Sequence, residues 1–220
     1  MSVPIVPDKF IKQIAKQMKR LNLKLSNEGW NAFRNVPREY FVRDKDQKRA
    51  YDDKPLYIES GQTISAPHMY AIMLSNELMD PSSGMNVLEI GTGSGYGAAL
   101  IAKLAPDGNV ITVERHKGLV DFASENLLKA GIQNVSVIHG DGTSLLFKEK
   151  FDRIIITAAG DKLPGSLLDC LTETGRIIMP IIEQNGEQWL YLITKSETSE
   201  PDFRRLIRVT FVPLIYDEIN

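Results

Sequence analysis

A short apolar run that leads directly into alternate glycines constrains the fold of this 220-residue chain more than any other feature. Residues 87–90 read Val-Leu-Glu-Ile, and glycines follow at positions 91, 93, 95 and 97. A buried strand that ends in glycines lets the backbone approach a ligand closely at the N-terminus of the next helix. The stretch therefore predicts a strand, a ligand-binding turn and a helix within an α/β fold.

Short apolar runs alternate with helical stretches from residue 85 to about residue 180. The expected strands are 85–90, 110–113, 135–138, 154–157 and 175–179, and the expected helices are 96–104, 119–130 and 163–171. This alternation predicts a Rossmann-like, doubly wound and mainly parallel sheet. Gly131 is placed to end the second helix at its C′ position. Apolar runs at 189–193 and 208–212, with no helix between them, predict antiparallel strands that complete the sheet.

The first 40 residues are expected to be helical. Apolar residues recur at helical spacing at Phe10, Ile11, Ile14, Met18, Leu21 and Leu25. We interpret this pattern as a packed amphipathic helix rather than a nucleic-acid-binding face. A second short helix around Trp30 and Phe33 should end near Val36, and the charged stretch 43–55 is expected to be an exposed connection.

Composition limits the classes of function. The formal net charge of −2 provides no general basic field for nucleic acid or an anionic membrane. No apolar run approaches the roughly 18–20 residues that span a bilayer, and the N-terminus lacks a secretory pattern. The single cysteine, Cys170, excludes an intramolecular disulfide, and with three scattered histidines it argues against a metal site. We therefore expect a cytoplasmic protein without a metal, a membrane partner or a nucleic-acid partner.

Carboxylates lie at the carboxyl ends of three successive predicted strands. Glu89 precedes the first glycine, Glu114 ends the next strand, and Asp141 follows the third, where it could meet an adenine amino group. An acid at the second position can accept both ribose hydroxyls, while an acid beside the glycines repels a pyrophosphate and favours a cation. The set favours S-adenosylmethionine, a positively charged nucleoside without phosphate. A dinucleotide stays open as an alternative, because the glycine pattern read from Gly93 is satisfied by Ala98.

Several segments carry a closer likeness over nearly the whole chain. They are 36–42 (VPREYFV), 50–56 (AYDDKPL), 61–69 (GQTISAPHM), the glycine loop, 114–120 (ERHKGLV), 140–142 (GDG), 151–152 (FD) and 212–214 (VPL). In these segments the sequence resembles the class I methyltransferases, and within them closely resembles the protein-L-isoaspartate O-methyltransferase family. Segment 61–69 is the most specific of them.

The resemblance implies that S-adenosylmethionine methylates the α-carboxylate of L-isoaspartyl residues in damaged proteins and peptides, a repair reaction. It implies that Ser65, with Thr63 beside it, has the catalytic role, and that backbone near Val212 helps to hold the peptide. The candidate cofactor-binding residues are Glu89, Gly91, Thr92, Gly93, Ser94, Gly95, Glu114, Arg115, Asp141, Gly142 and His68. The segment 212–214 resembles the C-terminal strand of the family. We expect a monomer or weak homo-oligomer.

The expected organisation is a single methyltransferase domain over 1–220, with an N-terminal helical and substrate-side segment (1–80), a cofactor-binding core (85–182) and C-terminal strands (183–220). Two other readings remain beside that of a dinucleotide-dependent oxidoreductase. A methyltransferase for RNA or a small molecule is disfavoured, because Thr-Ala-Ala-Gly at 157–160 replaces the motif that is typical of N-methylation. A cofactor-binding module without catalysis is disfavoured by the intact segment 61–69.

Overall fold

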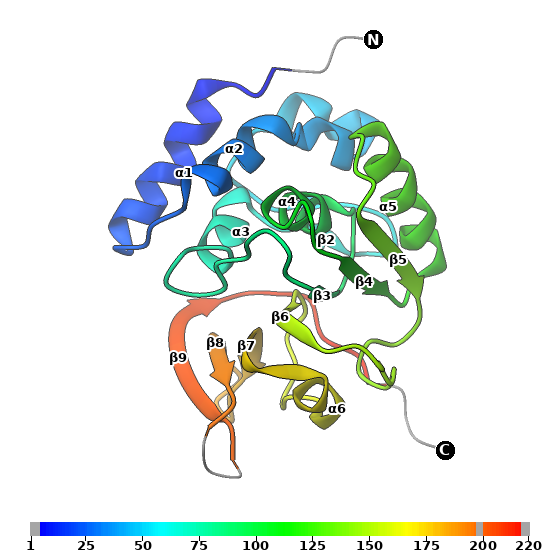
Figure 1. Cartoon of the computed structure of the whole chain (residues 1–220). Coiled ribbons are helices and arrows are strands. Elements are labelled where there is room, and N and C mark those ends of the chain that lie inside the picture. The colour runs from blue at the N-terminus through cyan, green and yellow to red at the C-terminus, as the bar shows by residue number, and fades with distance from the viewer. Residues whose placement is uncertain (1–4, 197–199, 217–220) are drawn as a thin grey trace.

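A seven-stranded sheet forms the centre of the computed structural model, which describes residues 5–196 and 200–216 (Figure 1). Its strands are β3 (Val87–Ile90), β4 (Val110–Glu114), β5 (Val135–His139), β6 (Phe151–Ile156), β7 (Leu171–Ile182), β8 (Gln188–Thr194) and β9 (Asp202–Val209). They lie in the order β5-β4-β3-β6-β7-β8-β9. The pairs from β5 to β7 are parallel, while β7–β8 and β8–β9 are antiparallel. The mainly parallel, Rossmann-like sheet predicted from the sequence is confirmed.

Helices lie on both sides of the sheet. They are α1 (Asp8–Arg20), α2 (Asn27–Asn35), α3 (Pro67–Met73), α4 (Tyr96–Leu104), α5 (Lys117–Lys129) and α6 (Gly165–Asp169), with 3₁₀ helices η1 (Arg38–Phe41) and η2 (Asp44–Arg49). Figure 1 shows α1 to α5 on one side of the sheet and α6 on the other. A separate hairpin of β1 (Leu56–Tyr57) and β2 (Thr63–Ile64) precedes α3.

The two sides of the sheet are packed by alternate residues of the same strands. In β3, Val87 belongs to the hydrophobic cluster beneath α1 to α5, while Leu88 and Ile90 belong to the cluster on the side of α6. In β6, Ile155 faces the first cluster, and Ile154 the second. Successive side chains of a strand point to opposite faces, so apolar residues in sequence bury both faces of the sheet.

Local signals set the helix ends of the N-terminal part. Helix α1 ends at Arg20, because Asn22 takes a left-handed conformation with φ of 54°. Leu25 is buried beyond the helix rather than within it, which shortens the predicted helix. Ser26 caps α2 by accepting a 3.0 Å hydrogen bond from the Gly29 amide.

Four expectations about secondary structure were partly wrong. The stretch 43–55 contains η2, and it is more than an exposed connection. Arg43, which precedes η2, donates to Asp46 at 2.9 Å, and Ala50, which follows η2, is fully buried. The final antiparallel strand covers Asp202–Val209 instead of 208–212. The segment 212–214 makes a single parallel bridge, between Ala159 and Pro213, in place of a strand. Helix α6 is shorter than predicted, because Leu171 already begins β7.

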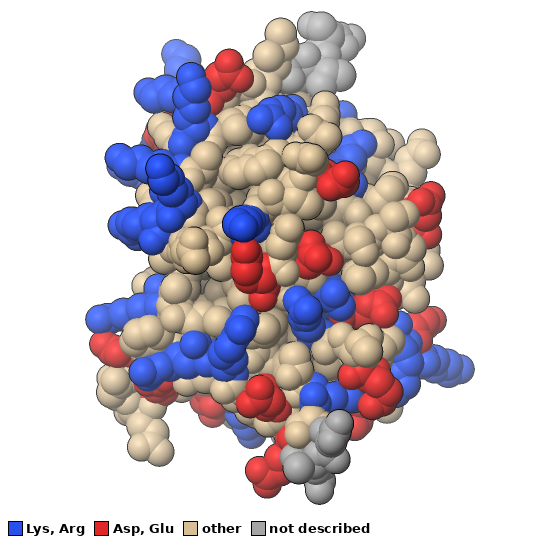
Figure 2. Space-filling model, turned by 60° about the vertical axis from the view of Figure 1, so that its left-hand side comes forward, with Lys and Arg blue, Asp and Glu red and all other residues tan. Residues whose placement is uncertain are grey.

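The surface carries both signs of charge. Figure 2 shows basic side chains collected along one margin of the displayed face, with acidic and basic side chains mixed over the rest. Within the described ranges, no helix combines the length and the apolar character needed to cross a membrane. The same part of the chain holds no group of three or more His, Cys, Asp or Glu side chains that could bind a metal ion.

Candidate active site

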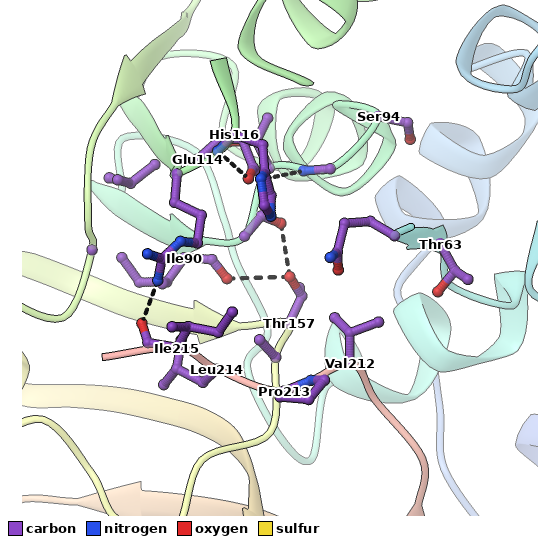
Figure 3. A pocket seen from close by; sticks show the side chains of 18 of the residues that line it. Thr63, Ile90, Ser94, Glu114, His116, Thr157, Val212, Pro213, Leu214 and Ile215 are labelled. Atoms are coloured by element: carbon purple, nitrogen blue, oxygen red, sulfur yellow. Dashed lines mark hydrogen bonds between the residues drawn. The ribbon is translucent and has the colours of Figure 1, made fainter. Parts of the chain in front are cut away.

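A cavity opens at the carboxyl ends of the parallel strands, where the sheet order reverses between β3 and β6 (Figure 3). Ligands of open α/β sheets bind at such a switch point. Six segments line this first cavity: 62–65 with Tyr70, the glycine loop at 90–94, the end of β4 at 113–116, the turn 140–142, residues 157–158 after β6, and the C-terminal segment 212–215. The predicted ligand-binding turn therefore lies where the fold rule places it.

The glycine loop needs glycine for two separate reasons. Gly91, Gly93 and Gly95 have φ values of 96°, 55° and 86°, in the left-handed region that other residues rarely adopt. A Cβ atom at Gly91 would also lie 2.4 Å from the Thr157 hydroxyl oxygen, which donates a 2.7 Å hydrogen bond to the Gly91 carbonyl. The loop thus follows the floor of the cavity closely and leads into α4 at Tyr96.

Glu114 is held rigidly at the end of β4. Its Oε2 accepts a 2.9 Å hydrogen bond from the Gly93 amide, and its Oε1 accepts one of 2.9 Å from the His116 amide. The residue is buried, yet it lines the cavity. A carboxylate oxygen can accept two hydrogen bonds, so each oxygen keeps a lone pair for a hydroxyl of a ligand. The arrangement suits a vicinal diol such as that of a ribose.

Asp141 and Gly142 form the far wall of the cavity, beyond β5. Asp141 Oδ1 accepts hydrogen bonds of 2.8 Å from both the amide and the hydroxyl of Thr143, which fixes the turn. A Cβ atom at Gly142 would lie 2.5 Å from Ile90 Cδ1, so a side chain here would crowd the wall. With Glu114, Asp141 gives the lining two carboxylates against the single guanidinium of Arg115, a net negative charge that favours a cation over a pyrophosphate.

Glu89 does not line the cavity, although it precedes the glycine loop. It is 1% exposed and points toward α4, where its Oε1 lies 2.2 Å from the position of a Cβ atom on Gly97. Its Oε2 accepts a 2.6 Å hydrogen bond from Thr112 Oγ1. Burial raises the pKa of Glu89 to about 8; the Thr112 hydrogen bond opposes this rise and the charge of Glu114 adds to it. Glu89 therefore packs beneath the glycine loop, outside the lining of the cavity.

A second cavity of about 440 Å³ adjoins the first. Thr63, Ser65, Thr157 and Val212 line both cavities. The remaining wall of the second cavity includes Pro55, Ala66, Met69 and residues 208–211. The four shared residues thus form a boundary between two spaces, and three of them carry a hydroxyl group. Such a boundary could bring a bound ligand of the first cavity next to an acceptor in the second.

His68 lines the second cavity, not the first. Its Nδ1 lies 2.8 Å from Asp53 Oδ1, which also accepts a 3.0 Å hydrogen bond from the His68 amide. These hydrogen bonds and the charge of His68 lower the pKa of Asp53 against the opposing effect of burial, the largest single influence. The structure therefore places the imidazole at the second cavity, and the predicted contact of His68 with the cofactor stays a prediction.

Comparison with known proteins identifies the family. Residues 9–219 match the family model described as Protein-L-isoaspartate(D-aspartate) O-methyltransferase (PCMT). The chain belongs to this family. A relative from Methanopyrus kandleri, named protein-L-isoaspartate O-methyltransferase, is 46% identical over 94% of this chain and 91% of its own length. A relative of the same name from Pyrococcus horikoshii is 43% identical over 93% of this chain and 92% of its own length.

A solved member of the protein-L-isoaspartate O-methyltransferase family has the same fold. The crystal structure of the Plasmodium falciparum protein, in complex with S-adenosyl-L-homocysteine, superposes with a TM-score of 0.79. It is 32% identical in sequence and covers 93% of this chain and 97% of its own. The agreement extends beyond the Rossmann-like core, since it takes in nearly the whole of both chains.

Sequence reasoning missed several lining residues of this family member. Thr157 and Tyr70 line the first cavity, but a threonine after a strand and a tyrosine in a helix carry no local signal of a site. His116 had no assigned role, although its amide holds Glu114. A role for backbone near Val212 in holding the peptide was predicted, but the position of 212–215 along the first cavity was not. It depends on a contact between distant parts of the chain, in which the Ala159 amide donates to the Val212 carbonyl at 2.8 Å. Of the predicted residues, Gly95 lies outside the lining, at the cap of α4.

Proposed function

We propose that this chain transfers a methyl group from S-adenosylmethionine to the α-carboxylate of L-isoaspartyl residues in damaged proteins and peptides. The observation that carries the proposal is the boundary of Thr63, Ser65, Thr157 and Val212 between two adjoining cavities. One cavity has the carboxylates and glycines that suit a cationic nucleoside. The other, of about 440 Å³, would receive the acceptor residue of the peptide. Membership of the protein-L-isoaspartate O-methyltransferase family supports this assignment.

The first cavity suits S-adenosylmethionine. Glu114 would hold the ribose hydroxyls through its remaining lone pairs, and Asp141 with Gly142 would meet the adenine. The glycine loop at 91–95, with Thr92 and Ser94, would pass beneath the amino acid part. Arg115 also lines this cavity, and its Nη1 donates to the Ile215 carbonyl at 2.9 Å, which ties the C-terminal segment to the end of β4. When bound, the cofactor supplies a methyl group on a sulfonium.

The acceptor side needs positioning more than proton transfer. A carboxylate is ionised near neutral pH, so no strong general base is required. The Ser65 and Thr63 hydroxyls can donate hydrogen bonds that orient this carboxylate. Orientation of two bound reactants can lower a barrier by the order of 7–11 kcal/mol. A boundary with little water also favours the approach of opposite charges, whose attraction is stronger at low dielectric.

We further propose that the chain acts as a single domain, as a monomer or weak homo-oligomer, in the cytoplasm and without a nucleic-acid partner. The net charge of −2 supports the last point. The single cysteine, Cys170, is buried and suits a reducing compartment.

The test is methyl transfer from radiolabelled S-adenosylmethionine to two synthetic peptides that differ only in L-isoaspartate or L-aspartate at one position. Base-labile labelling of the isoaspartyl peptide alone is expected, because a carboxyl methyl ester hydrolyses in base. Equal labelling of both peptides would refute the substrate class. Absence of labelling with cofactor binding intact would refute the acceptor and would favour RNA or small molecules instead.

A further inference from the structure

Arg38 is a fully buried arginine at the start of η1 whose guanidinium is held by main-chain carbonyl groups. Its Nη1 donates to the Ala50 carbonyl at 2.5 Å, and its Nη2 donates to the carbonyls of Lys54 at 3.2 Å and Ser65 at 3.1 Å. In the described part of the chain, no carboxylate lies within salt-bridge distance of this guanidinium. The guanidinium therefore links three chain segments through hydrogen bonds to their carbonyl groups.

The two carbonyls bound by Nη2 lie at the two ends of one hairpin. Lys54 lies two residues before β1, and Ser65 directly follows β2. The hairpin carries Thr63 on β2 and ends at Ser65, so Arg38 closes its base beside two of the three hydroxyl groups of the boundary. The planar guanidinium has five N–H donors in a fixed geometry, which lets one side chain fix several carbonyls at once.

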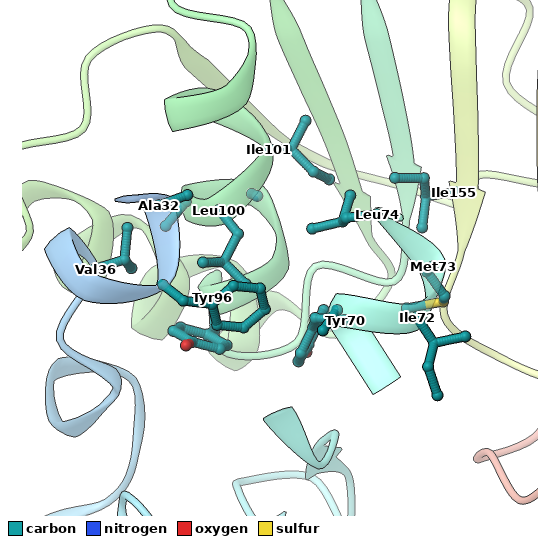
Figure 4. Packing of buried hydrophobic residues seen from close by; sticks show 14 of the residues in the cluster. Ala32, Val36, Tyr70, Ile72, Met73, Leu74, Tyr96, Leu100, Ile101 and Ile155 are labelled. Atoms are coloured by element: carbon teal, nitrogen blue, oxygen red, sulfur yellow. The ribbon is translucent and has the colours of Figure 1, made fainter. Parts of the chain in front are cut away.

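The same guanidinium contacts the start of the helix that follows the glycine loop. Arg38 Cζ lies 5.9 Å from the centre of the Tyr96 ring, and Tyr96 is the first residue of α4. Tyr70 on α3, which follows Ser65 in the chain, packs edge-on against Tyr96 at 5.4 Å between ring centres (Figure 4). Arg38 and the two tyrosines thus join the hairpin to the cofactor side of the site.

Stability alone gives a poor reason for this arrangement. Burial lowers the pKa of Arg38, and the nearby Tyr96, Tyr70, Asp53 and Asp52 only oppose this effect. A buried charge usually costs as much stability as its interactions return, and a packed apolar side chain can replace it. What an apolar side chain cannot replace is the fixed distance between three carbonyls.

We propose that Arg38 is a positioning residue for methyl transfer. Its guanidinium fixes the β1–β2 hairpin against the start of α4 and so sets the direction in which Ser65 presents its hydroxyl to the acceptor carboxylate. The inference rests on the function proposed above and adds a residue that touches neither the cofactor cavity nor the acceptor cavity. Arg38 acts through Ser65.

The test compares Arg38→Lys with Arg153→Lys. Lysine keeps the charge but cannot bridge both ends of the hairpin. Arg153 is a matched control, because it is also buried, donates to the carbonyls of Met79 and Asp152, and lines neither cavity. Both full-length variants are assayed well below their melting temperatures for kcat, peptide KM, S-adenosyl-L-homocysteine affinity and hydrogen exchange of residues 54–66.

For Arg38→Lys we expect kcat to fall by about tenfold to a hundredfold, the loss typical of a small misplacement of reacting groups. The affinity for S-adenosyl-L-homocysteine should stay at the parent value, while hydrogen exchange in residues 54–66 becomes faster. Arg153→Lys should keep both the parent kcat and the parent exchange of this segment. If Arg38 had only a structural role, Arg38→Lys would lower the melting temperature without this selective loss of kcat.

Equal kcat values for the two variants, or parent-like exchange of residues 54–66 in Arg38→Lys, would overturn the proposal. The exchange measurement is independent of the acceptor. If the parent protein does not methylate the isoaspartyl peptide, the proposed function fails. Unchanged hydrogen exchange in Arg38→Lys would then still overturn the role of Arg38. Faster exchange confined to residues 54–66 would support the conclusion that Arg38 fixes the hairpin.

Discussion

Replacing Glu89 by glutamine should stabilise the cofactor-free protein progressively as the pH rises from about 5 to about 8, compared with the parent chain. The carboxyl group is 1% exposed, and Thr112 Oγ1 donates to it at 2.6 Å. Burial raises its pKa from 4.5 to about 8. Well below pH 4.5 the group is protonated in both the folded and the unfolded chain, so it does not lower the free energy of unfolding. Above that value the unfolded chain releases a proton that the folded chain retains, and stability falls.

The size of the effect follows from the same pKa change. At about 1.4 kcal/mol per pKa unit, a rise from 4.5 to about 8 corresponds to a loss of roughly 5 kcal/mol once the pH is well above 8. Between pH 5 and pH 8 most of this loss develops, roughly 3 kcal/mol. Glutamine has nearly the same shape, stays neutral and can accept the Thr112 hydroxyl, so Glu89→Gln should not show this loss.

The assay is urea denaturation at 25 °C and constant ionic strength, at several pH values between 5 and 8.5. The quantity of interest is the difference in the free energy of unfolding between Glu89→Gln and the parent, because the other titrating groups cancel in this difference. The same substitution at exposed Glu125 on α5 is the control. A difference for Glu89→Gln that does not change with pH, or that falls as the pH rises, would refute the buried-carboxyl reasoning.

Three further substitutions test the two cavities. Ser65→Ala should lower kcat by about tenfold to a hundredfold, a cost of about 1–3 kcal/mol for one lost donor, with S-adenosyl-L-homocysteine affinity unchanged by calorimetry; equal rates would remove its orienting role. Glu114→Gln should weaken that affinity by about tenfold or more, because a charged acceptor is lost; parent-like affinity would contradict the ribose contact. Gly91→Ala should lower both the melting temperature and cofactor affinity, since its Cβ would lie 2.4 Å from Thr157 Oγ1 at a φ of 96°; an unchanged melting curve would contradict the close approach.

Local patterns in the sequence predicted the core of the fold well. The apolar runs that became β3, β4 and β5 are short, buried and bounded by helices or turns. Gly131 ends α5 with φ of 67°, at the predicted C′ position. The glycine loop can likewise be predicted from its own residues and the strand that precedes it. These features depend on neighbours along the chain, which a sequence shows directly.

Contacts between distant segments could not be predicted in this way. Arg38 looks like an ordinary charged residue, and only the folded chain brings the carbonyls of Ala50, Lys54 and Ser65 around it. Glu89 precedes the glycine loop in sequence, but the alternation of β3 turns its side chain toward α4 and away from the cavity.

The C-terminal segment is a third such case. The Leu214 amide donates to the Ala159 carbonyl at 2.7 Å, and Gln188 on β8 accepts a 2.6 Å hydrogen bond from the Phe211 amide. These bonds hold 211–214 over the cavity without forming a strand of the sheet, so the β pattern of the sequence was misleading there.

The most direct test of the two-cavity account is a crystal structure of the protein with S-adenosyl-L-homocysteine and an L-isoaspartyl peptide bound together. We predict that the adenosyl group lies in the first cavity with its ribose hydroxyls on Glu114. The peptide should lie in the second cavity, with its isoaspartyl α-carboxylate within hydrogen-bonding distance of the Ser65 hydroxyl. A peptide bound elsewhere, or an isoaspartyl carboxylate turned away from Ser65, would contradict the account.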